Sequence, residues 1–218
     1  MGLTLYIGNK NYSSWSFRPW LAMKAANIAF KEVVIPLYTG ATDKQRILDV
    51  SPAGKVPVLT DGDVTVWDSI AIIEYLAEKF PGAQLWPQDP ASRAHARAIS
   101  AEMHGGFGAL RRECGMNIHR PLRAKELSEE ARENIARVQE IWTDCRKHYG
   151  RTGPFLFGAF TAADAMYAPV VHRFRTYAID ASPPVQEYME AMLAYPPFSE
   201  WTAQALAETL VIDRFETD

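Results

Sequence analysis

Short apolar runs alternate with segments of helical spacing in the first part of the chain. The apolar runs are rich in β-branched residues and predict strands, while apolar positions recurring every three or four residues predict helices. The order predicted is β-α-β-α-β-β-α, with a hairpin turn at Asp61-Gly62-Asp63. The strands are expected at residues 3–7, 30–35, 56–60 and 64–67, and the helices at residues 19–26, 43–50 and 68–80.

Two of these helices have clear starting signals. Pro19 stands where a first helical position is expected, because the N–H that proline lacks has no helical partner at that position. Asp68 and Ser69 are favoured N-cap residues ahead of the next amphipathic segment. Pro81-Gly82 then ends that segment.

Strand signals almost vanish after residue 85. Long helices are predicted over residues 91–112 and 128–149, and shorter ones over residues 185–193 and 198–210. Thr161 and Asp164 have the spacing of a capping box, with aspartate in place of the usual glutamate. The chain is therefore predicted to divide into an α/β domain, a linker and an all-helical domain. Their expected ranges are residues 1–82, 83–90 and 91–218.

Composition narrows the possible functions. Of 218 residues, 48% are hydrophobic and 22% are charged. The net charge is −3, and the charged side chains are scattered along the sequence. The sequence therefore predicts no basic patch for nucleic acid or an anionic membrane. No stretch approaches the roughly 20 apolar residues of a membrane helix, and no signal peptide is evident. We therefore expect a cytoplasmic protein that binds neither nucleic acid nor membrane.

Cysteine usage argues against a metal or redox centre. The only cysteines, Cys114 and Cys145, form no C-x-x-C pair, so we expect two small buried side chains and no metal. No P-loop or G-x-G-x-x-G motif is present either.

Several motifs occur in the order of a known family. Val56-Pro57 ahead of a hairpin resembles a thioredoxin-like domain, and a hairpin running directly into Asp68-Ser69 is similar to glutathione transferases. Residues 160–164 are similar to the internal capping box of that family's helical domain. The resemblance covers essentially the whole chain. It implies a thioredoxin-like α/β N-terminal domain followed by an all-α C-terminal domain.

One motif narrows the resemblance within the family. Residues 13–18, Ser-Ser-Trp-Ser-Phe-Arg, resemble the zeta-class motif, in which two serines precede a cysteine and an arginine closes the run. Residues 51–59 resemble the family's segment around its cis-proline. Trp15 replaces the zeta-class cysteine, and this departure weighs against a maleylacetoacetate isomerase.

The resemblance implies glutathione as co-substrate and gives the serines a role. A thiol with a pKa of about 8.5 is mostly protonated at neutral pH. A hydroxyl that donates to sulfur near a helix N-terminus favours the thiolate. Ser13, as the first serine of the zeta-like pair, is the preferred donor, and Ser14 is its rival. From the residues alone, both could equally be loop or N-cap residues.

Five further residues are implied in glutathione binding. A cis bond before Pro57 would turn the Val56 backbone toward the cysteinyl peptide of glutathione, whereas a trans proline would only begin an edge strand. Asp68 would meet the γ-glutamyl ammonium while Ser69 and free N–H groups bind its carboxylate, a role compatible with simple capping. Lys55 is expected either at the glycyl carboxylate or in solvent.

The second-substrate pocket is predicted on one face of the first long helix. That face carries Met103, His104, Phe107 and Arg111. Core packing is the alternative for its apolar members, and surface exposure for its polar ones.

These expectations favour an enzyme, a glutathione transferase that conjugates the thiolate to a small electrophile. The alternatives are a zeta-type cis–trans isomerase and a non-catalytic glutathione-transferase-like module. The resemblance also implies a homodimer and a role in detoxification.

Overall fold

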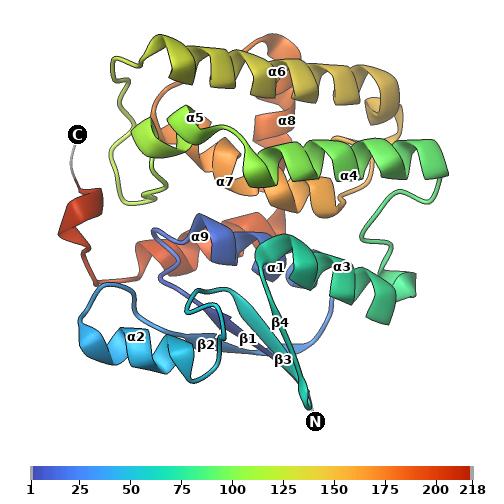
Figure 1. The fold of residues 1–218 in the computed structure, drawn as a ribbon. Coiled ribbons are helices and arrows are strands. Elements are labelled where there is room, and N and C mark those ends of the chain that lie inside the picture. Colours follow the sequence, from blue (N-terminus) through green and yellow to red (C-terminus); the bar gives the residue numbers. More distant parts are fainter. Residues whose placement is uncertain (1, 217–218) are drawn as a thin grey trace.

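The computed structural model describes residues 2–216, apart from the side chains of residues 41 and 42 (Figure 1). Its N-terminal part has the predicted element order. The elements are β1 (Leu3–Ile7), α1 (Ser14–Ala25), β2 (Phe30–Val34), α2 (Ala41–Leu48), β3 (Val58–Asp61), β4 (Val64–Trp67) and α3 (Ser69–Lys79).

The four strands form one mixed sheet in the order β2-β1-β3-β4. β1 pairs in parallel with β2 and antiparallel with β3, where Leu5 lies opposite Leu59. Both leucines are fully buried. β3 and β4 form the predicted hairpin. Apolar side chains at alternate positions of β1 therefore anchor the sheet to its covering helices.

The C-terminal part is helical; in Figure 1 its helices α4 to α8 lie above the sheet and α1, and α9 lies beside α1. Helix α7 is buried along almost its whole length, because its sequence is apolar on nearly every face. The helices are α4 (Pro90–Gly105), α5 (Gly108–Glu113), α6 (Glu129–Tyr149), α7 (Ala162–Thr176), α8 (Pro183–Ala194) and α9 (Pro196–Leu206), with short 3-10 turns at Pro81–Ala83, Gly150–Thr152 and Asp213–Phe215.

An aromatic cluster joins the two parts. Phe17 of α1 stacks on Trp201 of α9 with ring centroids 4.7 Å apart, and Trp20 meets the same indole edge-on at 5.1 Å. His172 of α7 stacks on Phe198 at 4.6 Å. All five rings are almost fully buried. Their packing fixes α1 against the helical part.

The predicted start of the first helix was wrong. Helix α1 begins at Ser14, and Pro19 lies inside it. Ser13 is the N-cap, and its hydroxyl accepts the Ser16 N–H at 3.4 Å. The serine cap therefore starts the helix earlier than the proline signal indicated, and the buried surroundings of α1 hold the proline in place.

The predicted single helix over residues 91–112 is also wrong, because it is broken between α4 and α5. Gly105 and Gly106 weaken helix propagation, and Phe107 adopts a left-handed conformation with φ of 59°. The Arg111 side chain folds back and donates from Nε to the Gly106 carbonyl at 2.9 Å. It thereby satisfies the carbonyl end of α4. The last helix also ends earlier than predicted, at Leu206.

The capping box predicted at residues 161–164 is confirmed. Asp164 is fully buried and accepts hydrogen bonds from the Thr161 N–H at 2.8 Å and the Leu156 N–H at 3.0 Å. It therefore caps α7 and ties the preceding loop to it.

Replacing Asp164 should test how much this cap stabilises the fold. We expect Asp164→Ala to lower the free energy of unfolding by about 2–4 kcal/mol, because it removes the cap and leaves buried N–H groups unpaired. Urea unfolding followed by circular dichroism measures the change. Glu187→Ala, an exposed acidic position on α8, is the control and should change stability by less than about 0.5 kcal/mol. Equal effects of the two variants would contradict the assigned role.

Candidate active site

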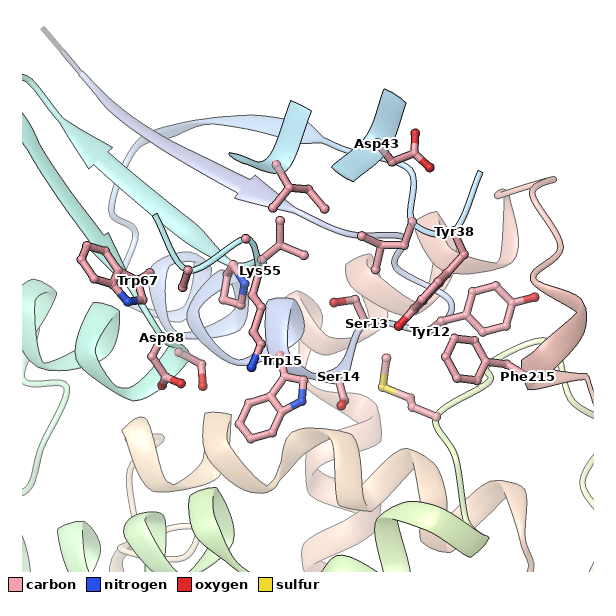
Figure 2. A pocket seen from close by; sticks show the side chains of 18 of the residues that line it. Tyr12, Ser13, Ser14, Trp15, Tyr38, Asp43, Lys55, Trp67, Asp68 and Phe215 are labelled. Atoms are coloured by element: carbon pink, nitrogen blue, oxygen red, sulfur yellow. The ribbon is translucent and has the colours of Figure 1, made fainter. Parts of the chain in front are cut away.

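A cleft of about 1080 Å³ lies between the α/β part and the helical part (Figure 2). The whole set of residues implied in thiol activation and glutathione binding lines this one cavity. These are Ser13, Ser14, Lys55, Val56, Pro57, Asp68 and Ser69. Residues from three separate segments of the α/β part are thus brought together.

The two serines lie at the N-terminal end of α1 and differ in their hydrogen bonds. The Ser13 hydroxyl is 2.7 Å from that of Ser16, which in turn accepts the Gly8 N–H at 3.0 Å. The Ser14 hydroxyl has no hydrogen-bond partner within residues 2–216. Ser13 is therefore held in a chain of hydrogen bonds, whereas Ser14 is available to a ligand.

Val56 and Pro57 form the wall beside the serines. Their peptide bond is cis, as the resemblance implied. In the described part of the chain, neither the N–H nor the carbonyl of Val56 has a hydrogen-bond partner. Both groups remain free to pair with an extended ligand.

Asp68 and Ser69 occupy the start of α3. Asp68 Oδ1 accepts the Ile70 N–H at 3.0 Å and so caps the helix, while the residue itself has a φ of 70°. The Ser69 hydroxyl is buried and has no hydrogen-bond partner in the described part of the chain. An unused hydroxyl at the positive end of a helix is suited to a carboxylate. Lys55 precedes Val56 in the same wall, and its side chain extends toward Trp15 (Figure 2).

The predicted second-substrate residues do not share one face, because the break after Gly105 separates them. Arg111 lines the cleft, but Met103 and Phe107 are buried in the hydrophobic core. His104 instead contacts Asp68, with Nε2 3.4 Å from Oδ2, and meets the Trp15 ring edge-on. Burial lowers the pKa of His104; Asp68 raises it, and two neighbouring arginines lower it.

Several residues of the cleft were missed. Two of them, Tyr12 and Trp15, flank the serines, and Trp67 precedes Asp68, so proximity in sequence could have indicated them. Others come from distant segments, and no motif marks them. The additional side chains include Tyr12, Trp15, Tyr38, Trp67, Met116, Arg173 and Phe215.

Trp15 forms part of the floor beside the serines. The Arg18 guanidinium lies 4.4 Å from the centre of its ring, and that of Arg111 lies 4.8 Å away. Such cation–π contacts hold the indole and place positive charge close to the cleft.

Neither cysteine has the properties of a nucleophile. Both side chains are buried, as expected. Burial raises the pKa of the Cys114 thiol to about 11 and that of Cys145 to about 12. A thiolate at neutral pH must therefore come from a ligand.

Comparison with known proteins agrees with this geometry. Residues 12–79 match the family model for the glutathione S-transferase N-terminal domain, and residues 125–203 match that for the C-terminal domain. A probable maleylacetoacetate isomerase from Caenorhabditis elegans is 30% identical over 201 residues, covering 89% of this chain and 90% of that protein. Glutathione S-transferase Z2 from Arabidopsis thaliana is 28% identical over 188 residues, covering 80% of each chain.

A solved structure shows the same fold. A glutathione transferase homologue from Burkholderia, with bound glutathione, superposes with a TM-score of 0.71 at 24% identity, covering 95% of this chain and 100% of that one. The fold and the cleft thus define a protein with a thioredoxin-like α/β part and an all-helical part. The chain belongs to the glutathione S-transferase family, which confirms the resemblance found in the sequence. No helix within residues 2–216 is long and apolar enough to cross a membrane.

Proposed function

We propose that the protein binds glutathione in this cleft and transfers it, as the thiolate, to a small electrophile. The observation that carries the proposal is the convergence of three kinds of polar group on one cavity. The serine hydroxyls lie at the start of α1, and Asp68 and Ser69 lie at the start of α3. The free backbone groups of Val56 lie in the wall of the cavity. Family membership supports the same reaction class.

Each group matches a part of glutathione. The Val56 N–H and carbonyl would pair with the cysteinyl peptide as an added strand. The Ser69 hydroxyl and the N-terminal N–H groups of α3 would bind the γ-glutamyl carboxylate, and Asp68, 46% exposed at its side chain, would bind the ammonium. Lys55 would reach the glycyl carboxylate. This arrangement directs the thiol toward the start of α1.

At that position, the Ser13 hydroxyl is the proposed hydrogen-bond donor to the thiolate of glutathione. With sulfur bound, Ser16 can donate to the Ser13 oxygen while it accepts the Gly8 N–H, which leaves the Ser13 hydrogen for the sulfur. A hydroxyl that itself accepts hydrogen bonds is a stronger donor. The thiolate then attacks the electrophilic carbon, a carbon–sulfur bond forms, and the leaving group departs with its electron pair. The unpartnered Ser14 hydroxyl remains the rival donor.

A glutathione-dependent cis–trans isomerase is the second candidate. The zeta-like serine motif and the probable maleylacetoacetate isomerase among the relatives favour it. Such an enzyme adds the same thiolate reversibly and returns glutathione. Product analysis distinguishes the two, because conjugation retains glutathione in the product. A non-catalytic module is the third candidate, and an absence of glutathione binding in calorimetry at millimolar ligand would favour it.

We also propose a cytoplasmic homodimer with a role in detoxification. Exposed apolar side chains on both parts support association, among them Trp67 on β4 and Leu122 in the helical part. Two-fold pairing is the commonest oligomer geometry. We expect light scattering to give twice the 24.5 kDa mass of the chain. A concentration-independent monomer mass would refute the dimer.

The two serines can be separated by their pH profiles. Lowering the thiol pKa by about two units is worth roughly 2.7 kcal/mol. Removing the responsible hydroxyl should therefore lower kcat/KM for the electrophile at pH 7 by up to about 25-fold, because the thiolate fraction falls from about 0.76 to about 0.03, with recovery near pH 9. We expect this for Ser13→Ala, a smaller loss for Ser16→Ala, and little change for Ser14→Ala. The reverse result for Ser13 and Ser14 would reassign the donor. If all three variants keep the pH profile of the wild-type protein, none of these hydroxyls activates the thiol of glutathione.

Asp68 should act on binding more than on the chemical step. Its proposed partner, an ammonium, keeps its charge throughout the reaction, so the contact is equally strong in the ground and transition states. We expect Asp68→Asn and Asp68→Ala to raise the KM for glutathione about ten- to a hundredfold while kcat changes little.

Asp89→Ala is the matched control, because Asp89 caps α4 outside the cleft and accepts the Ser92 N–H at 2.9 Å. It should lower the melting temperature without raising the KM. A fall in kcat at constant KM in the Asp68 variants would count against the assigned role.

A further inference from the structure

Three arginines meet at the base of the cleft with unused hydrogen-bond donors. Arg18, Arg111 and Arg173 each donate from Nε to a backbone carbonyl, at distances of 2.8 to 3.1 Å. Both terminal nitrogens of Arg18, and Nη1 of Arg111 and of Arg173, are buried and have no hydrogen-bond partner among residues 2–216. Buried donors of this kind are rare in folded proteins unless a ligand or water meets them.

Within residues 2–216 none of the three guanidinium groups forms an ion pair. Burial and the other two arginines lower the pKa of Arg18, while the charge of Asp68 acts on it from beyond ion-pair distance and raises it. Arg18 and Arg173 are 0% and 4% exposed. Burial lowers the pKa of Arg173 to about 10, and the charge of Arg111 acts in the same direction. Positive charge is therefore concentrated where the protein offers little to neutralise it, and an anion bound there would be strongly favoured.

Two of these arginines are accessible from the cleft. Arg111 and Arg173 line it together with Gly115 and Met116, which follow α5. The acidic side chains of the cleft are engaged elsewhere. Asp43 accepts the Thr39 N–H at 2.5 Å, and Asp68 caps α3. Arg173 and Met116 line the cleft and are not among the residues proposed to contact glutathione.

The same cleft also has an aromatic wall. Tyr12, Tyr38 and Phe215 lie on one side of the serines in Figure 2, while Asp68 and Trp67 lie on the other. The Phe215 ring is 5.6 Å from both tyrosine rings. Aromatic and thioether groups beside a planar ligand favour stacked and edge contacts.

We propose that the electrophile is an arene that carries a carboxylate. Its ring packs against Tyr12, Phe215 and Met116, and its carboxylate binds the guanidinium groups of Arg173 and Arg111. The inference rests on the proposed transfer of glutathione. With a haloarene, the thiolate sulfur forms a bond to the ring carbon that bears the halogen. The carbon–halogen bond then breaks, halide leaves with the electron pair, and the carboxylate is unchanged.

A pair of electrophiles that differ only in charge tests the proposal. Para-chloro-meta-nitrobenzoate and the corresponding benzamide have nearly the same shape. The kcat/KM of each is divided by the rate constant of its uncatalysed reaction with glutathione. We expect this normalised value to favour the benzoate by about tenfold or more, as for a charge-assisted contact. Equal values, or a preference for the benzamide, would overturn the proposal.

Two variants on α7 locate the effect. Arg173→Gln should remove most of the benzoate preference, and Arg173→Lys should retain part of it. Arg175→Gln is the control, because Arg175 is an exposed residue of the same helix, and it should keep the full preference. Equal losses in Arg173→Gln and Arg175→Gln would contradict a local site. Thermal unfolding and the glutathione Kd are measured for each variant.

Binding measurements separate this proposal from the proposed function. Calorimetry compares para-nitrobenzoate with para-nitrobenzamide on the wild-type glutathione complex, and needs neither turnover nor a folded variant. Tighter benzoate binding supports the anion site, and equal binding refutes it. If both electrophiles are conjugated with equal normalised kcat/KM, the proposed transferase activity stands and only the proposed anion site is refuted. If glutathione itself does not bind, the proposed function fails first.

Discussion

Helix α1 is buried from two sides, and the position of the active site depends on that packing. Its inner face covers the sheet, and its outer face packs against α7 and α9 through Phe17 and Trp20. Residues 16–23 are all buried. The N-terminal end of α1, where Ser13 and Ser14 lie, is therefore fixed by both parts of the chain. A hydroxyl held this firmly can act on a ligand without first being ordered.

The same packing explains why the cleft is polar on one side and cationic at its base. Backbone groups and helix N-termini of the α/β part offer neutral donors and partial positive charge, which the proposed function assigns to glutathione. The helical part contributes Arg111 and Arg173, whose side chains first satisfy carbonyl groups at the ends of other elements. The break between α4 and α5 allows Arg111 to do this. The irregular backbone there therefore contributes directly to the site.

Local signals predicted most of the fold and the residues of the proposed glutathione site, whose roles stay predictions. Strand periodicity, the Asp68 cap and the Thr161–Asp164 box depend on neighbouring residues, so a single sequence contains them. The early start of α1 and the break after Gly105 depend on a competing cap and on a distant side chain. Arg173 and Phe215 reach the cleft only through tertiary packing. Met103 and Phe107 had the right spacing, but they pack into the core.

The central claim is that this cleft holds glutathione as its thiolate, and the ionisation of the bound thiol tests it most directly. Thiolate absorbance of the wild-type complex, titrated over pH with free glutathione as reference, gives that pKa. We expect it to lie about two units below the free thiol value of about 8.5, because the start of α1 stabilises the anion. A bound thiol that titrates like free glutathione would contradict the account.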